Sequence, residues 1–297
     1  MVDRPLRRRG VLAAGLAGIG TALVGCGATP APTTPGRPTP ALDDLETRFG
    51  GRLGVAALDT GSGRWTGHRA DERFLLCSTA KVPVVAAVLR RSVTDPGLLD
   101  RRLHWTRADL LSHAPATTAA LDTGMTVAEL CAAALTVSDN TAANLLSAQV
   151  GGPAGVTAFL RGVGDTTSRA DRTEPTLNDV AGDLDTTTPT AFVRTLQALA
   201  LGDALPPALR DRLVGWMRAS TTGAAQIRAG VPAGWTVADK TGSGSAGESN
   251  DVGVVGPTGR APVVVAVFTA PADPRNATGA ATIAAATRAV LSGLATG

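Results

Sequence analysis

Residues 77–83, CSTAKVP, place a serine three residues before a lysine, and a long aliphatic run follows them. On a helix, residues three apart lie on the same face, so the Lys81 amine can reach the Ser78 hydroxyl. A serine at the start of a helix is also an ordinary N-cap, and the pattern taken alone favours that capping role.

Lysine usage indicates that this segment carries chemistry. Only two of the 28 basic residues are lysines, Lys81 and Lys240. A desolvated lysine can lose its proton near neutral pH and act as a base, which an arginine cannot do. We therefore treat both lysines as functional candidates.

Composition limits the classes of protein that need to be considered. The 297 residues can form one large domain or two lobes, and the apolar content of 44% is enough for a core. The net charge of +3 is mild and the arginines are scattered, which argues against nucleic-acid binding. The three cysteines and three histidines show no metal-ligand spacing, and no dinucleotide motif is present, so we expect no metal and no cofactor.

The first 26 residues have the features of an export signal. Arginines precede a weakly apolar run at residues 11–24, which is too short for a comfortable membrane span. Residues 23–26, LVGC, resemble the lipobox of bacterial lipoproteins, in which the cysteine, here Cys26, carries the lipid. The neighbouring arginines also resemble a twin-arginine signal. We expect a cell-envelope lipoprotein held at the membrane through Cys26 alone; the alternative is a secreted protein with a plain signal.

Residues 27–40 are mostly Ala, Thr, Pro and Gly and predict a linker. Hydrophobic periodicity in the remaining residues, 41–297, predicts an α/β (α+β) domain with strands at both ends of the chain and helices between them. Strands are expected at residues 52–60, 64–69, 235–241, 252–255 and 263–269, and the main helices at 41–49, 126–135, 140–150, 190–201, 206–220 and 278–294. A helical pattern is also expected to begin at Ser78, and Thr126 with Glu129 predicts a capping box.

Such an order requires an antiparallel five-stranded sheet assembled from both chain ends, with the terminal helices packed on it. We expect this α/β lobe to contain residues 41–77 and 218–297, and an all-α lobe to contain residues 78–217. The site should lie between the lobes.

Three further motifs follow the first: SDN at residues 138–140, RTEPTLN at residues 172–178, and KTGSG at residues 240–244. Each alone is weak, because SDN is common as a helix cap and KTG is a plausible turn. The four in this order resemble the class A serine β-lactamases, over residues 42–294. The resemblance implies the serine β-lactamase and penicillin-binding-protein fold, and hydrolysis of penicillins and cephalosporins through an acyl-serine, with resistance to these antibiotics as the result.

The resemblance also implies roles for residues. Ser78 is the nucleophile, and either Lys81 or Glu174, the latter through a water, is the base for acylation. Ser138 relays a proton to the β-lactam nitrogen. The backbone amides of Ser78 and Ser243 form the oxyanion hole. Substrate is bound by Asn140, Lys240, Thr241 and Ser243, and the hydrolytic water by Glu174 with Asn178.

Glu174 decides between the alternatives. An acyl-serine is stable until a water is activated to attack it, and penicillin-binding D,D-peptidases share the other three motifs but lack this glutamate. A D,D-peptidase and a non-catalytic β-lactam-binding lipoprotein remain the competing hypotheses. Arg172 and Asp185 resemble the ion pair that closes the loop carrying Glu174, here called the glutamate loop. The expected partner is a small β-lactam molecule, and we expect a monomer.

The chain departs from the family's pattern in several places. The loop between Asn178 and Asp185 is about two residues shorter, and His113 stands where an aromatic residue normally gates the entrance; an exposed surface role explains His113 equally well. Cys77 and Cys131 lack the cysteine partners found in some members, so we expect both thiols to be free and buried. No arginine that supports Lys240 can be assigned among the candidates near Arg228 and Arg275.

Overall fold

A computed structural model describes residues 40–295 of the chain. The expected signal segment, lipidation at Cys26 and the linker up to residue 39 lie outside these residues. Within residues 40–295, no helix has both the length and the apolar character that crossing a membrane requires.

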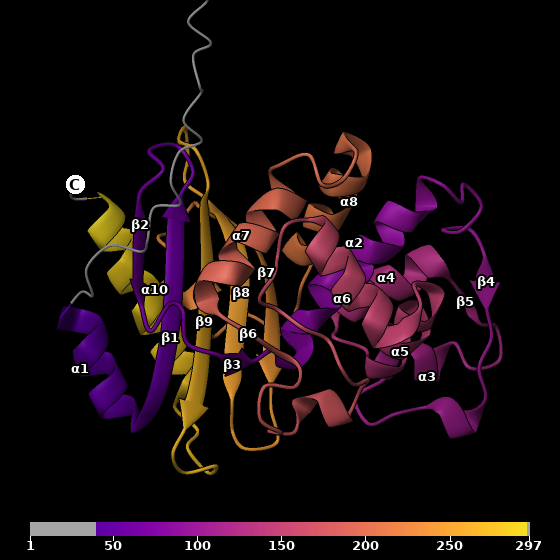
Figure 1. Cartoon of the computed structure of the whole chain (residues 1–297), viewed down its shortest axis with the longest axis horizontal. Coiled ribbons are helices and arrows are strands. Elements are labelled where there is room, and N and C mark those ends of the chain that lie inside the picture. Colours follow the sequence, from indigo (N-terminus) through magenta and orange to yellow (C-terminus); the bar gives the residue numbers. More distant parts are fainter. Residues whose placement is uncertain (1–39, 296–297) are drawn as a thin grey trace, which may run out of the picture. The chain divides into compact units, whose positions relative to one another are not determined.

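A five-stranded sheet runs through the molecule in the order β2-β1-β9-β8-β7, with every neighbouring pair antiparallel (Figure 1). The central pair joins the two ends of the chain, because β1 pairs with β9 from Gly51 opposite Pro271 to Asp59 opposite Val263. The predicted sheet is therefore confirmed. Its strands are β1 (Gly51–Asp59), β2 (Trp65–His68), β7 (Thr236–Ser243), β8 (Ser249–Gly256) and β9 (Val263–Pro271).

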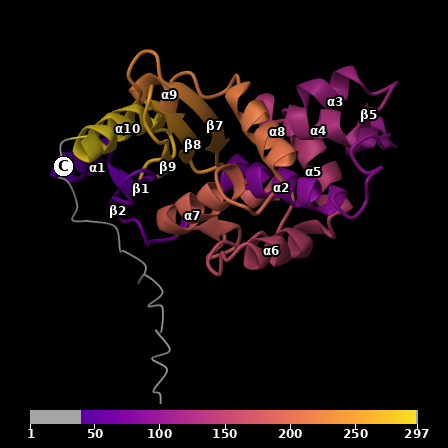
Figure 2. The same ribbon diagram turned by 90° about the horizontal axis from the view of Figure 1, so that it is seen from above.

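Both faces of the sheet are covered (Figure 2). Helices α1 (Pro40–Phe49) and α10 (Gly279–Ala295) pack on one face against Leu53 and Val55 of β1. The alternate residues of β1, Ala56 and Leu58, belong to the core on the opposite face, where α7 (Pro189–Ala200) lies. This alternation follows from the two-residue period of a strand.

The second lobe is helical, as predicted, and the capping box before α4 is confirmed: Thr126 Oγ1 accepts from the Glu129 amide, and Glu129 Oε2 accepts from the Thr126 amide. Its helices are α2 (Lys81–Ser92), α3 (Pro115–Ala119), α4 (Val127–Thr136), α5 (Asn140–Gln149), α6 (Gly152–Gly162) and α8 (Pro207–Arg218). A one-turn helix, α9 (Ile227–Gly230), precedes β7.

Two small strand pairs were not predicted from the sequence. The strand β3 (Phe74–Leu75) pairs with β6 (Thr186–Thr187), and β4 (Arg102–Leu103) pairs with β5 (Met125–Thr126). Two-residue strands carry no periodicity for a sequence pattern to detect. The β3–β6 pair matters for the site because it ties the segment before Ser78 to the end of the glutamate loop.

Cys77 and Cys131 are both buried and free, which confirms the prediction. Burial raises the pKa of the Cys131 thiol to about 12 and the pKa of Cys77 well above its ordinary value. Both thiols are therefore protonated at neutral pH.

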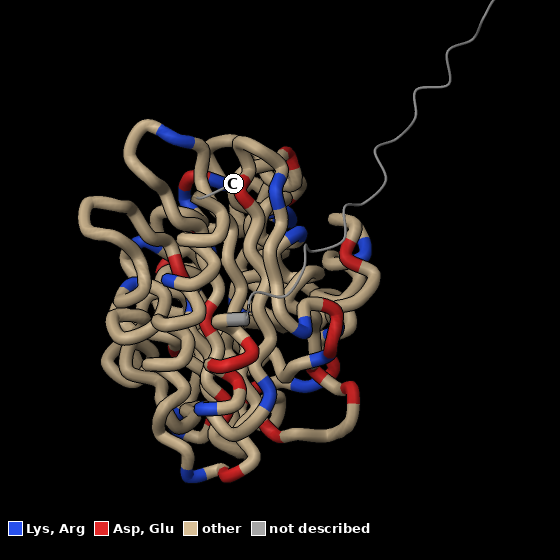
Figure 3. Tube along the Cα trace, turned by 90° about the vertical axis from the view of Figure 1, so that its left-hand side faces the viewer, with Lys and Arg blue, Asp and Glu red and all other residues tan. Residues whose placement is uncertain are grey.

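Basic and acidic positions are interspersed over the side of the molecule seen in Figure 3. No block of one sign dominates that view, which agrees with the scattered arginines of the sequence.

Candidate active site

Ser78 lies in a 3₁₀ turn, η1 (Cys77–Ala80), and helix α2 begins at Lys81. The expectation of an α-helix beginning at Ser78 is wrong by one turn, and the Ser78 hydroxyl does not cap α2. Instead the Lys81 Nζ lies 2.9 Å from Ser78 Oγ. The residue before Ser78, Cys77, has a φ of +49°, a left-handed conformation that is costly for a residue with a side chain.

Lys81 is 1% exposed and sits at the centre of the polar groups. Its Nζ lies 2.9 Å from the Ser138 carbonyl, 3.1 Å from Ser138 Oγ, 2.6 Å from Asn140 Oδ1 and 2.9 Å from Glu174 Oε1. Burial lowers the pKa of this amine, and the Glu174 carboxylate opposes that shift. The arrangement holds the amine in place and favours its neutral form more than water would.

Ser138 connects the two lysines. Lys240 Nζ donates to Ser138 Oγ at 2.9 Å and to the Thr241 carbonyl at 2.7 Å. Burial and the nearby Lys81 charge lower the pKa of Lys240 to about 7. Asp139 holds this turn: its carboxylate caps α5 through the Ala142 amide and accepts three further hydrogen bonds from α3.

Glu174 lies next to both Ser78 and Lys81. Ser78 Oγ donates to Glu174 Oε1 at 3.3 Å, and Asn178 Nδ2 donates to Glu174 Oε2 at 2.5 Å. The Glu174–Pro175 peptide bond is cis. Asn144 of α5 clamps the Glu174 backbone by accepting from its amide at 2.9 Å and donating to its carbonyl at 2.8 Å. Sequence reasoning gave Asn144 no role, although its place one helical turn after Asn140 could have indicated one.

The loop that carries Glu174 is closed at its base. The expected ion pair is present, with Arg172 Nε 2.6 Å from Asp185 Oδ2. Asp185 Oδ1 also accepts from the amides of Asp171 and Arg172. Beneath the loop, a cavity of only about 30 Å³ separates it from α2 and α5. The loop is therefore held together at its base by the contacts of Asp185.

Strand β7 forms the wall beside Ser78. Thr241 Oγ1 lies 2.6 Å from Thr222 Oγ1, and Ser243 is exposed at the end of the strand. A Cβ on Gly242 would lie 3.0 Å from Cys77 Cβ and 3.1 Å from the Ser78 amide nitrogen. Only glycine allows β7 and η1 to approach this closely.

Three residues with open roles lie at the edges of this site or away from it. His113 is exposed, with its ring nitrogen 2.9 Å from the Val137 carbonyl. Arg228 pairs with Asp239 through Nε and Nη2, and Arg275 pairs with Asp273 at the surface. The Lys240 amine contacts neither arginine; its two acceptors are Ser138 Oγ and the Thr241 carbonyl.

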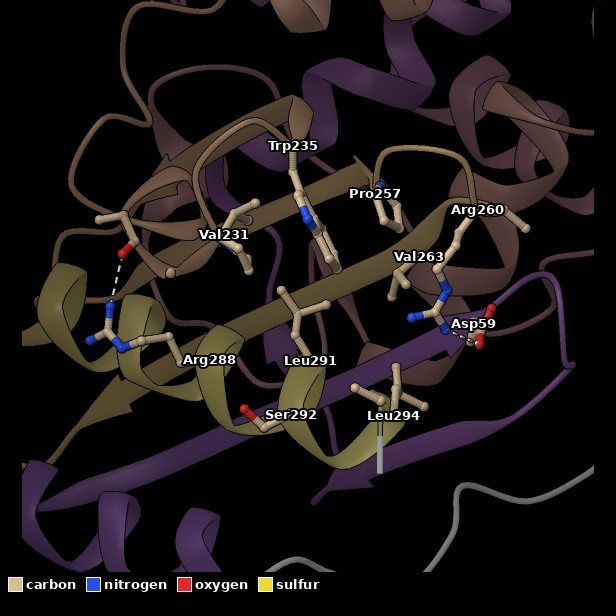
Figure 4. Close-up of a pocket in the computed structure, with 15 residues that line it drawn as sticks. Asp59, Val231, Trp235, Pro257, Arg260, Val263, Arg288, Leu291, Ser292 and Leu294 are labelled. Carbon is tan, nitrogen blue, oxygen red and sulfur yellow. Dashed lines mark hydrogen bonds and ion pairs between the residues drawn. The ribbon is translucent and has the colours of Figure 1, made fainter. Parts of the chain in front are cut away.

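A separate cavity of about 400 Å³ lies between α10 and the segments that flank β7 and β8 (Figure 4). Trp235, Val263 and Leu291 line it, and Arg260 and Asp59 lie at one end. None of the candidate catalytic residues lines this cavity, so its size gives no information about the chemistry at Ser78.

The chain matches the family model described as the β-lactamase enzyme family over residues 37–294. It is 48% identical to β-lactamase AST-1 of Nocardia asteroides, over 97% of this chain and 96% of that protein. The chain belongs to the class A β-lactamase family.

Two further β-lactamases are also about half identical to the chain. The carbapenem-hydrolysing β-lactamase KPC of Klebsiella oxytoca is 51% identical, over 84% of this chain and 86% of its own length. The solved class A β-lactamase from Mycobacterium abscessus has a TM-score of 0.85 and 56% identity, over 86% of this chain and 98% of that one. The match covers the whole described fold.

Proposed function

We propose that this class A β-lactamase hydrolyses the β-lactam ring of penicillins and cephalosporins through an acyl-serine at Ser78, and thereby gives resistance to them. The single observation that carries the proposal is the position of Glu174, whose carboxylate lies 3.3 Å from the Ser78 hydroxyl and 2.9 Å from the Lys81 amine. A carboxylate this close to the nucleophile can direct a water molecule onto an acyl group attached to Ser78.

Acylation requires removal of the Ser78 proton. Lys81 can take it directly in its neutral form, and Glu174 can take it through a water. Both lie within reach, so both routes remain open. Ser138 receives hydrogen bonds from both lysines and can pass a proton to the β-lactam nitrogen as the ring opens. The amides of Ser78 and Ser243 are assigned to the oxyanion, since Gly242 draws η1 close to β7.

Substrate binding is assigned to β7 and the start of α5. Lys240, Thr241 and Ser243 bind the carboxylate that penicillins and cephalosporins carry, and Asn140 binds the acylamide side chain. The support is the placement of these groups around Ser138, where Lys81 contacts Asn140 and Lys240 contacts Ser138.

Deacylation is assigned to Glu174 and Asn178. The Asn178 amide donates to Glu174, and its Oδ1 is buried without a hydrogen-bond partner among residues 40–295. A buried acceptor next to a carboxylate suits a water that both residues orient. This pairing distinguishes the proposal from a D,D-peptidase and from a non-catalytic binding lipoprotein.

We also propose export as a monomeric lipoprotein anchored through Cys26, by the twin-arginine or the general route. The support is the lipobox resemblance of residues 23–26. Mass spectrometry of the mature N-terminus tests this, because a diacylglycerol mass on Cys26 that is absent from Cys26→Ala is expected. Cleavage at another residue without lipid would instead indicate a plain secreted protein.

Turnover counting tests the enzymatic proposal. A soluble chain beginning at Ala41 is mixed with excess chromogenic cephalosporin, and the product formed per enzyme is counted. Many turnovers are expected. A single burst with a stable mass increase on the Ser78 peptide would overturn the hydrolase assignment in favour of a penicillin-binding protein. No reaction with penicillins or cephalosporins would overturn both of these assignments.

A further inference from the structure

Two buried carboxyl groups lie on the paired strands β7 and β8. Asp239 and Asp251 are both 0% exposed. In the strand register, Asp239 is opposite Gly253 and Asp251 is opposite Thr241, so the two aspartates are diagonal neighbours on one face. Side chains at such diagonal positions can reach each other.

Each carboxyl group has one oxygen with a partner and one without. Asp239 Oδ1 accepts from the Arg228 guanidinium, and Asp251 Oδ2 accepts from the Ile227 amide at 3.0 Å. The second oxygens, Asp239 Oδ2 and Asp251 Oδ1, are buried and have no hydrogen-bond partner among the described residues. A buried carboxylate oxygen without a donor is expensive, and two such groups in one site cannot both ionise easily.

We propose that Asp251 is protonated at neutral pH and donates its proton to Asp239 Oδ2, so that the pair carries a single negative charge matched by Arg228. The pair is then a positioning element behind Lys240: it supports β7 without adding a second buried anion. The Lys240 charge is thereby left available for the carboxylate of the substrate. The consequence for substrate, though not the shared proton itself, rests on the proposed function.

The charges around the pair agree with this assignment. Burial raises the pKa of Asp251 well above its ordinary value, and the neighbouring Asp239 raises it further. Burial also raises the pKa of Asp239, and Arg228 opposes that shift, which makes Asp239 the more acidic of the two. Lys240 is the second cation that faces the pair; Lys240 in turn faces Lys81 and Glu174.

Infrared spectroscopy of the protein labelled with ¹³C at the aspartate carboxyl groups tests the shared proton directly. At neutral pH, a band from a protonated carboxyl group is expected in the unmodified protein and is expected to disappear in Asp251→Asn. Absence of the band in the unmodified protein would overturn the proposal, since two ionised carboxylates bridged by water give none. This measurement needs no turnover, so its failure is distinct from failure of the proposed function.

Kinetics tests the consequence for Lys240. In Asp251→Asn, the amide oxygen can accept from Ile227 while the NH₂ donates to Asp239 Oδ2, so the charge is unchanged. We expect kcat and KM for a chromogenic cephalosporin to stay within about twofold of the unmodified enzyme. The alkaline limb of the plot of kcat/KM against pH should not shift. Asp239→Asn removes the single charge, and its alkaline limb should move to lower pH by about one unit. An equal shift in Asp251→Asn would show that Asp251 is ionised and would overturn the proposal.

Asp165 provides the matched control. It is also buried, but both of its oxygens accept: Oδ1 from the amides of Thr167 and Ser168, and Oδ2 from the Thr195 hydroxyl at 2.7 Å. Asp165→Asn removes the charge that strengthens all three hydrogen bonds and forces the Thr195 hydroxyl to accept instead of donate, so it should lower the Tm by several degrees. Asp251→Asn should leave the Tm close to that of the unmodified protein; a loss as large as that of Asp165→Asn would contradict a donor role for Asp251.

Discussion

Gly242 of β7 and Ser78 of η1 lie so close together that a Cβ on Gly242 would be 3.1 Å from the Ser78 amide nitrogen. The two assigned oxyanion amides belong to the two segments that meet here. Their separation therefore depends on the one position in β7 that has no side chain.

Gly242→Ala should disturb this contact, because the new methyl group must push η1 and β7 apart. Displacements of this kind cost roughly 10–100-fold in kcat/KM. The measurement is steady-state hydrolysis of a chromogenic cephalosporin. Gly215→Ala in α8 is the control, because its Cβ would meet nothing within 4 Å and should leave activity unchanged. Unchanged activity in Gly242→Ala would remove the close contact from the mechanism.

Glu174→Ala should separate the two halves of the reaction. Ser78 and Lys81 remain, so acylation proceeds if Lys81 is the base, while deacylation should slow by roughly 100-fold or more. Intact-mass spectrometry should show an acylated protein that persists, and Ser78→Ala should show none. Turnover at the unmodified rate would contradict the role assigned to the loop.

Asp185→Asn should loosen the base of the glutamate loop. Asp185 accepts from the Asp171 and Arg172 amides and pairs with the Arg172 side chain, so loss of its charge should cost on the order of 2–3 kcal/mol. Thermal unfolding and the rate of deacylation are the measurements. Arg169→Ala removes a more exposed ion pair with Asp171 and should cost less than about 1 kcal/mol. Equal losses in the two variants would show that the Asp185 contacts are not special.

Lys240 should make substrate affinity depend on pH near neutrality. Its pKa, lowered to about 7 by burial and by Lys81, means that the amine is charged below pH 7 and loses its charge above it. The KM for a carboxylate-bearing substrate should therefore rise as the pH increases through this range. Lys240→Arg keeps its charge throughout, so its KM should stay flat over the same range. A parallel rise in Lys240→Arg would assign the pH dependence to another group.

Glu46 should anchor α1 to the sheet through its charge. Burial raises the pKa of Glu46, but hydrogen bonds from Arg69, the Leu53 amide and His68 outweigh it and lower the pKa to about 2. This stabilisation is present above the unfolded pKa of 4.5 and is lost as the pH falls from there toward 2. Glu46→Gln should cost roughly 1–3 kcal/mol at pH 7 and much less near pH 2.

Chemical or thermal unfolding at the two pH values measures that difference. Glu72→Gln is the control, because Glu72 pairs with Arg52 and Arg69 at a more exposed position and should cost less than about 1 kcal/mol. A Glu46→Gln cost that does not change with pH would show that its charge is not the source of stability.

The sequence predicted the sheet, the helical lobe and the four motifs, because each has a local signature. Short apolar runs bounded by turn residues marked β1 and β9, and residue spacing placed Lys81 within reach of Ser78. The helix start at Ser78 was wrong because the turn there is fixed by contacts from distant segments. The Leu76 amide donates to the Asp185 carbonyl, and Gly242 packs against Cys77.

Contacts between distant segments account for what sequence reasoning missed. The clamp of Asn144 on the Glu174 backbone joins residues 30 positions apart, and nothing near either residue indicates the other. Arg228 was considered as a support for Lys240, but it pairs with Asp239, whose burial is visible only once β7 and β8 are paired. Sequence patterns report faces and turns, and they do not report which buried charges meet.

The pairing of β1 with β9 also has a consequence for when the enzyme can first work. Every residue assigned to the chemistry, from Ser78 to Ser243, is synthesised before β9, and β9 lies between β1 and β8 in the sheet. A nascent chain that ends before Val263 thus contains all four motifs but lacks the strand that joins the two halves of the sheet. The sheet that carries Lys240 and Ser243 is therefore incomplete until β9 has been made, so activity cannot precede the synthesis of β9.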